Sequence, residues 1–264
     1  MLPPEPSAVV GVLVGAWLYG SGVRTLWRRA GRGHVVKPWQ VVCFALGLLA
    51  ILVALESPID SLSDQLFAVH MVQHLLLILI AGPLLVIGAP LAPMLWALPR
   101  DSRAPVGAVV RRLVVAAPVA LAVHSIALWI WHVPPLYEAA INSRGIHVLE
   151  HLCFLVTSAL FWWSILHPGR NGYALGGVYV LVLSVQSMLL GALLTFSSGA
   201  WYTSHLATTA AWGLSPLEDQ QLAGLIMWVP GGVVYLVCAL VLFGVWLKQP
   251  ADTPAPAIHT PVHR

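Results

Sequence analysis

The amino-acid sequence predicts an all-α, polytopic membrane protein, a bundle of about seven transmembrane helices. Of its 264 residues, 59% are hydrophobic and only 9% are charged, whereas about 25% of the residues of a soluble domain are charged. The mean hydropathy is +0.84, and a net charge of +3 is too small to suggest binding to nucleic acid. Three cysteines, at positions 43, 153 and 238, lie far apart in apolar stretches and predict no disulfide.

Apolar stretches long enough to cross a bilayer, roughly 17–25 residues each, are separated by proline and glycine, as at Ser57-Pro58 and Val133-Pro134-Pro135. We expect spans at 8–27, 37–56, 65–87, 109–131, 148–166, 174–197 and 221–247. They form one bundle domain over 1–248, and residues 249–264, rich in proline, predict a disordered cytoplasmic tail. The N-terminus lacks a basic leader, so no cleavable signal peptide is expected.

The basic residues predict how the bundle is oriented. Twelve of the 13 Lys and Arg lie in the first, third and fifth connections or after the last span, and only Arg144 lies on the other side. Short loops rich in Lys and Arg stay in the cytoplasm. The N-terminus is therefore expected outside and the C-terminus in the cytoplasm, which fits an odd number of spans.

Two pairs of histidines lie at one depth in this arrangement. His70 and His74 are four residues apart, as are His147 and His151, so each pair occupies one face of its helix. His132 and His124 approach the same outer layer from the fourth span. Ionisable residues inside a bilayer are costly and usually mark a site. We therefore expect a metal or haem site near the outer end of the bundle.

Spacing alone does not separate copper from haem. A zinc peptidase would need a glutamate directly after the first histidine of a pair, and the sequence here is His-Met-Val-Gln-His from position 70. A soft Cu(I) ion would accept histidine with sulfur ligands such as Cys153 or Met227. Met71 points about 100° away from His70 on an ideal helix and is expected to pack or to face lipid. A haem with two axial histidines is equally compatible with the pairs.

Four motifs carry a resemblance to a known family. They are His-Met-Val-Gln-His-Leu-Leu-Leu (70–77) with Gly-Pro-Leu-Leu-Val-Ile-Gly-Ala-Pro (82–90), Trp-His-Val-Pro-Pro-Leu-Tyr-Glu-Ala-Ala (131–140), His-Val-Leu-Glu-His-Leu-Cys-Phe-Leu (147–155) with Phe-Trp-Trp (161–163), and Asp-Gln-Gln-Leu-Ala-Gly-Leu-Ile-Met-Trp-Val-Pro-Gly-Gly (219–232). Together they resemble the CtaG family of bacterial polytopic membrane proteins, which are assembly factors of the caa-type cytochrome c oxidase. The resemblance covers about 60–245.

This resemblance implies a non-enzymatic protein of the bacterial cell membrane that helps copper, as Cu(I), reach the copper centre of the oxidase catalytic subunit. An extracytoplasmic copper donor would be a further partner. The implied copper residues are His70, His74, His132, His147 and His151, and the implied supporting residues are Glu150, Asp219, Gln220 and Met227. His124, in the same outer layer, and Cys153, a candidate sulfur ligand, complete the set of expected supporting residues.

Three alternatives remain open from the sequence. A haem-binding electron carrier would use the paired histidines as axial ligands. A metal or proton transporter would use polar residues within spans, such as Gln186 and His74. A purely structural scaffold for the oxidase would need no metal at all.

Overall fold

The computed structural model describes residues 6–113, 115–167 and 172–249. The described residues form helices and no strand, which confirms the predicted fold class. The predicted tail, from residue 250 on, lies outside them. The elements are α1 (Pro6–Ala30), α2 (Pro38–Glu56), α3 (Pro58–Ser63), α4 (Phe67–Leu75), the π-helix η1 (Leu76–Ala81), α5 (Gly82–Ile87), α6 (Leu91–Ala97), α7 (Arg100–Leu113), α8 (Ala117–Trp131), α9 (Pro134–Asn142), α10 (Arg144–Leu166), α11 (Gly172–Thr195), the 3₁₀-helix η2 (Thr209–Trp212) and α12 (Pro216–Leu247).

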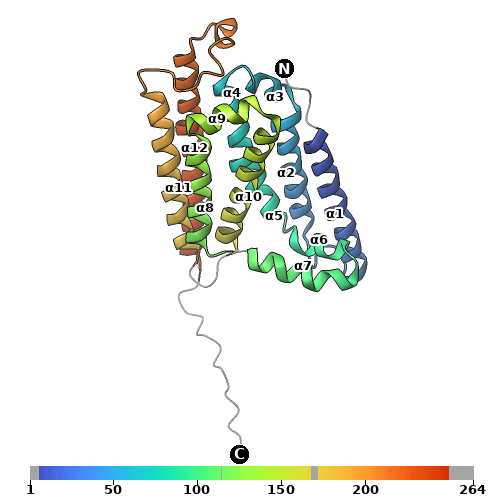
Figure 1. Ribbon diagram of the computed structural model, residues 1–264. Coiled ribbons are helices and arrows are strands. Elements are labelled where there is room, and N and C mark those ends of the chain that lie inside the picture. Colours follow the sequence, from blue (N-terminus) through green and yellow to red (C-terminus); the bar gives the residue numbers. More distant parts are fainter. Residues whose placement is uncertain (1–5, 114, 168–171, 250–264) are drawn as a thin grey trace, which may run out of the picture.

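Six of the described helical segments are long and apolar enough to cross a membrane, and a bent pair, α7 with α8, makes a seventh if it counts as one span. The span expected at 109–131 corresponds to this pair, and its two helices are bent by 74° relative to each other. Ala116 is extended ahead of Pro118, in the first turn of α8, where proline is tolerated. Helix α7, with Arg111 and Arg112 in its last turn, packs mainly on α6 and lies across one end of the bundle (Figure 1).

The third span is interrupted by the π-helix η1, and Pro83 explains why one carbonyl group of this π-helix accepts hydrogen bonds from another helix. The N–H of Gly82 donates to the carbonyl of Leu77 in the wide π pattern. The next bond of that pattern would run from residue 83 to the carbonyl of Ile78, but Pro83 has no N–H. From α10, Ser158 and Trp162 instead donate to this carbonyl, at 2.7 and 3.1 Å. These bonds tie the third span to α10.

Helices α11 and α12 form a closely packed antiparallel pair (Figure 1). Small residues allow the approach, since a Cβ at Gly224 would lie 2.4 Å from Oγ1 of Thr195 and 2.5 Å from the carbonyl oxygen of Gly191. Close contact between small residues is a common way for membrane helices to associate. Helix α12 also packs on α4, so this pair supports one side of the site.

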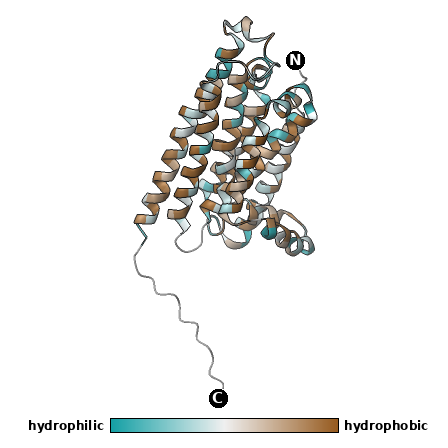
Figure 2. Ribbon diagram, turned by 60° about the vertical axis from the view of Figure 1, so that its left-hand side comes forward, coloured by the Kyte–Doolittle hydropathy of each residue, from teal (hydrophilic) through white to brown (hydrophobic). Residues whose placement is uncertain are grey.

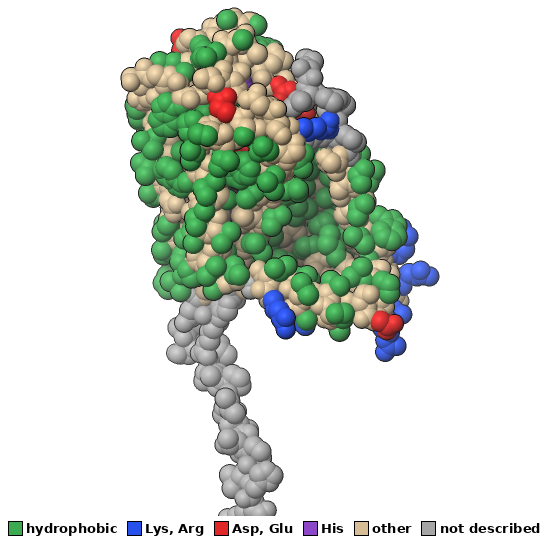
Figure 3. Space-filling model, viewed as in Figure 1, with side chains coloured by type: hydrophobic (Ala, Val, Ile, Leu, Met, Phe, Trp, Pro, Cys, Tyr) green, Lys and Arg blue, Asp and Glu red, His purple; other side chains and the backbone are tan. Residues whose placement is uncertain are grey.

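The surface of the bundle is apolar, as a lipid-facing surface should be. Along the helices the residues are mostly hydrophobic, whereas hydrophilic residues gather toward the two ends (Figure 2). Val185, for example, is 63% exposed and Leu240 60%. Lys and Arg side chains gather at the end that carries α7 (Figure 3). We call this the α7 end and the opposite one the α9 end.

Candidate metal centre

The two predicted histidine pairs face each other across the gap between α4 and α10. The ring centroids are 4.2 Å apart within each pair. Across the gap, the ring of His70 lies 5.3 Å from that of His147, and the ring of His74 lies 5.5 Å from that of His151. All four side chains are buried, with at most 5% exposure. The i, i+4 spacing therefore brings four imidazoles together.

Glu150 lies among these imidazoles, one residue before His151 on α10. Its Oε2 is 3.6 Å from Nε2 of His70, and its Oε1 is 3.7 Å from Nε2 of His74. The carboxylate is fully buried. One ligand atom from each of His70, His147, Glu150 and His151 can be chosen so that all four lie within 4.8 Å of one another. We call these four residues together with His74 the His–Glu cluster.

The polar atoms of the His–Glu cluster lack hydrogen-bond partners among the described residues. This holds for both ring nitrogens of His70, His74 and His151, for Nε2 of His147 and for both carboxylate oxygens of Glu150. Buried polar groups are almost always hydrogen-bonded, and leaving them unpaired costs free energy. A neutral imidazole offers one lone pair, so a cation bound between α4 and α10 could take one ligand atom from each of His70, His147, Glu150 and His151, and these residues fit a metal ion.

His132, at the end of α8, lies beside the His–Glu cluster, but its nearest polar neighbours are a backbone carbonyl and a methionine sulfur. Its Nδ1 lies 2.6 Å from the carbonyl oxygen of Leu128, and its ring is 6.1 Å from that of His74. A hydrogen bond at Nδ1 leaves the lone pair at Nε2, which lies 3.3 Å from Sδ of Met71. Met71 is 1% exposed; it packs, as predicted, and its contact is with a histidine. Imidazole and thioether together suit a soft ion such as Cu(I).

Asp219 and Gln220 hold the backbone around the cluster. No side chain of α4 itself caps its first turn. The carboxylate of Asp219, on α12, accepts hydrogen bonds from the backbone N–H groups of Phe67 at 2.7 Å and Ala68 at 3.0 Å. Gln220 accepts a hydrogen bond from the N–H of Trp201. Both residues therefore position elements that carry or cover the cluster.

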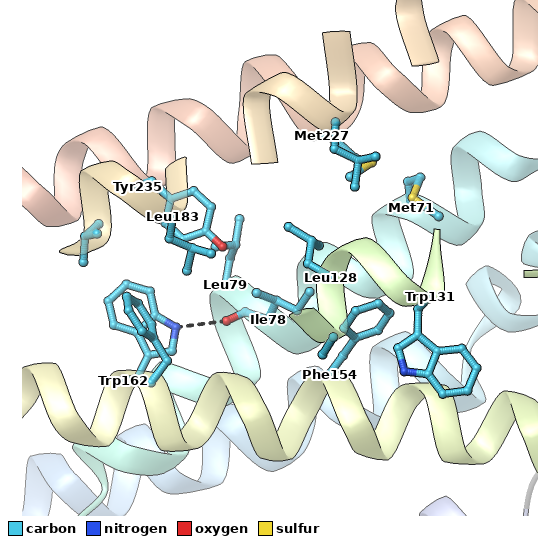
Figure 4. Packing of buried hydrophobic residues seen from close by; sticks show 14 of the residues in the cluster. Met71, Ile78, Leu79, Leu128, Trp131, Phe154, Trp162, Leu183, Met227 and Tyr235 are labelled. Carbon is cyan, nitrogen blue, oxygen red and sulfur yellow. Dashed lines mark hydrogen bonds between the residues drawn. The ribbon is translucent and has the colours of Figure 1, made fainter. Parts of the chain in front are cut away.

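Three other predicted supporting residues lie outside the His–Glu cluster. Nδ1 of His124 is hydrogen-bonded to Oγ1 of Thr157 at 2.8 Å, and its ring stacks 6.2 Å from Phe161. Cys153 is a free, partly buried cysteine packed against the apolar core. Met227 belongs to the same buried apolar core as Met71 (Figure 4).

The connection between α11 and α12, residues 196–215, closes the α9 end near the cluster through residues that are not among the predicted site residues. The hydroxyl of Tyr137, on α9, lies 2.7 Å from Nε2 of His205, and its ring is 5.2 Å from that of His70. Glu138 accepts hydrogen bonds from the backbone N–H of Thr203 and from the hydroxyl and N–H of Ser204. Tyr137 and Glu138 stand in the motif at 131–140, which was the available signal.

Burial sets the charge of His205 in this connection. The side chain is 2% exposed, and burial lowers its pKa, although the carboxylates of Asp219 and Glu138 act in the opposite direction. A neutral ring can accept the hydrogen bond that the Tyr137 hydroxyl donates. The connection is therefore held over the cluster by two kinds of contact. One is the hydrogen bond between the uncharged side chains of Tyr137 and His205, and the other is the set of hydrogen bonds that the Glu138 carboxylate accepts.

The fold and the site together define a polytopic membrane protein with a buried candidate metal centre. The model of the family described as cytochrome c oxidase caa3 assembly factor (Caa3_CtaG) matches residues 17–249, so this chain belongs to that family. The uncharacterized protein Mb0105 of Mycobacterium bovis is 24% identical over 252 residues, covering 88% of this chain and 37% of the relative. The uncharacterized protein ML1998 of Mycobacterium leprae is 24% identical over 238 residues, or 84% of this chain and 36% of the relative. The chain thus spans little over a third of these relatives' length, and no solved structure matches it.

Proposed function

We propose that this protein assists assembly of a bacterial cytochrome c oxidase by holding copper in the His–Glu cluster and delivering it to the copper centre of the catalytic subunit. In this role the protein is not an enzyme, and copper is its cargo. The family supports the assembly role. The observation that supports copper is the set of four imidazoles and one carboxylate, buried together without hydrogen-bond partners.

The available ligands suit an ion that must be released again. Imidazole binds copper, and a carboxylate adds a hard ligand suited to Cu(II), whereas the pair of His132 and Met71 offers nitrogen and sulfur to Cu(I). None of the three cysteines lies in the cluster, so no thiolate would retain the ion tightly. We propose that Cu(I) is the species carried.

The predicted orientation gives the cargo a route. It places the α9 end, and with it the His–Glu cluster, toward the outer face of the bacterial cell membrane. Copper would then arrive from an extracytoplasmic donor and leave toward a partner embedded in the same bilayer. The connection at 196–215 covers the cluster on this side, so its opening would control entry.

The surroundings of the cluster support copper over haem or transport. A haem would need a wide slot between its two axial imidazoles, whereas Tyr137 and Phe154 pack directly against the histidine rings at 5.2 and 4.6 Å. A transporter would need a polar path toward the α7 end. Apolar side chains, among them Ile78, Leu79, Trp162 and Leu183, fill the core on that side of Phe154 (Figure 4).

Anaerobic loading with Cu(I) tests the site directly. The full chain, the double variant His70→Ala/His74→Ala and the control His124→Ala would be loaded side by side, desalted and assayed for copper. We expect bound copper in the parent and in His124→Ala, whose ring lies outside the cluster, and loss in the double variant. No copper in a well-folded parent, or equal loss in the control, would contradict the proposal.

Oxidase assembly is tested separately in cells. A strain lacking this protein and any paralogue would be grown under copper limitation, and the copper content of its purified oxidase would be measured. We expect oxidase deficient in copper, restored by the parent gene and not by the double variant. Fully copper-loaded oxidase in the deletion strain would refute the delivery role.

A further inference from the structure

A second candidate binding site lies at the α7 end, away from the His–Glu cluster. Two adjoining cavities of about 440 and 530 Å³ share Leu91 and Trp163 in their walls. The larger one is walled by apolar residues of α1, α2, α5 and α10, including Leu48 and Leu160. Figure 3 shows a hollow lined by hydrophobic side chains just above α7. It faces the region that lipid tails occupy.

The smaller cavity adds a positive charge to this apolar hollow. Its wall includes Arg103 of α7 and Trp96 of α6. The guanidinium of Arg103 lies 4.4 Å from the centroid of the Trp96 ring, and that of Arg29, from α1, lies 5.4 Å from the same ring. Within the described part of the chain, no carboxylate forms an ion pair with either group. Both guanidinium groups lie against the same Trp96 ring, and among the described residues neither has a carboxylate to balance its charge. Such a pair of positive charges favours the binding of an anion beside it.

We propose that this hollow binds one anionic phospholipid, with its phosphate at Arg103 and its acyl chains in the cavity walled by Leu48 and Leu160. Basic pockets next to membrane helices on the cytoplasmic side recognise anionic headgroups, and the predicted orientation places α7 on that side. Tryptophan at such a boundary is favoured because its ring is apolar and its N–H is polar. The Arg103 guanidinium thus adjoins the apolar cavity as the phosphate of a phospholipid adjoins its acyl chains.

A transmembrane helix of a partner fits this hollow less well than a lipid. Helix α7 lies across the end of the bundle (Figure 1), just below the hollow that Figure 3 shows. An inserted helix would therefore be stopped before it reached the membrane surface. A phospholipid needs only one end open for its chains. The lipid would also fill space between α1 and α10, which both line the larger cavity.

Lipid retention by the purified full chain tests the proposal. The protein would be delipidated in mild detergent, given phosphatidylglycerol or phosphatidylcholine, and analysed by native mass spectrometry. Arg103→Gln removes the charge, Arg103→Lys keeps it, and Ala159→Phe narrows the acyl chamber from α10, where Ala159 lines it. Arg112→Gln is the matched control, since Arg112 is an exposed arginine of the same helix.

We expect about one phosphatidylglycerol per parent chain, and retention about tenfold weaker in Arg103→Gln, as loss of a charge-assisted phosphate contact predicts. Ala159→Phe should also lose the lipid, while Arg103→Lys and Arg112→Gln keep it. Because Arg103 also donates to the carbonyls of Leu98 and Trp96, Ala159→Phe decides the matter if Arg103→Gln fails to fold. Equal retention of phosphatidylcholine, equal loss in Arg112→Gln, or equal binding of free glycerol phosphate would overturn the proposal.

Discussion

Replacing Asp219 by alanine should destabilise the protein and weaken the proposed metal centre without removing any of its candidate ligands. The carboxylate on α12 accepts hydrogen bonds from the first two backbone N–H groups of α4, at 2.7 and 3.0 Å. The side chain is fully buried, so water does not replace it readily. Loss of the carboxylate leaves both N–H groups unpaired at the positive end of the α4 dipole.

The size of the effect follows from the two bonds. Each hydrogen bond to a charged group contributes about 1.5–3 kcal/mol, and unpaired buried donors add their own cost. Relief from burying the carboxylate itself offsets part of this, so we expect Asp219→Ala to lower the free energy of unfolding by about 3 kcal/mol. Asp219→Asn keeps one acceptor oxygen and should lose about half as much. Because His70 follows Phe67 by only three residues, fraying of this turn should also weaken copper binding.

Unfolding in mixed detergent micelles, followed by tryptophan fluorescence, measures the change. The matched control is Asp101→Ala, which removes an exposed carboxylate from the first turn of α7 and should cost no more than about 0.5 kcal/mol. If Asp219→Ala unfolds at the same detergent fraction as Asp101→Ala, the carboxylate does not hold the start of α4, and the reasoning fails.

Three further predictions concern the elements around the site. Gly224→Val should destabilise the α11–α12 pair by about 2 kcal/mol or more, because its Cβ would lie 2.4 Å from Oγ1 of Thr195. The control Gly199→Val, with open space around its Cβ, should lower the free energy of unfolding far less in the same assay. Glu138→Gln should speed hydrogen exchange at 203–204, since the carboxylate accepts three hydrogen bonds there; unchanged exchange would contradict this. Burial lowers the pKa of His205 below its unfolded value of about 6.5, so the unfolded connection binds more protons in acid and the closed one loses stability as the pH falls below about 6.5. After correction for the slower intrinsic exchange in acid, the protection factors at 200–212 should therefore be smaller at pH 5.5 than at pH 7.5 in the parent and much less pH-dependent in His205→Gln.

The sequence predicts the fold well because hydropathy is a local signal. Six expected spans correspond to long apolar helices, since about 20 apolar residues have few alternatives to a membrane helix. The expected span at 109–131 corresponds to the bent pair of α7 and α8, and composition alone does not locate the bend ahead of Pro118. The π-helix at Leu76–Ala81 could not be predicted from the sequence either, because it depends on hydrogen bonds that side chains of α10 donate to its backbone.

The candidate site is predictable only in part. The histidine pairs could be found because i, i+4 spacing fixes one face of a helix, and the structure brings both faces together. The contact of Met71 with His132 joins residues 61 apart, and the bond from Phe67 to Asp219 joins residues 152 apart. No periodicity in the chain encodes such pairs. The sequence could mark Asp219 as part of a motif, but its role as a cap depends on how α12 packs against α4.

Hydrogen bonds with two neighbouring helices, α12 and α10, hold the third span on both sides of His70 and His74, independently of any bound ion. At the α9 end, Asp219 holds the first turn of α4, one turn before His70. Toward the α7 end, the carbonyl of Ile78, one turn beyond His74, is held by Ser158 and Trp162 of α10. The histidine pairs thus lie between two anchored points, with seven of their eight ring nitrogens unpaired among the described residues. A site anchored on both sides would need little ordering to bind an ion, and the unpaired groups that destabilise it when empty would become the ligands of the proposed copper ion.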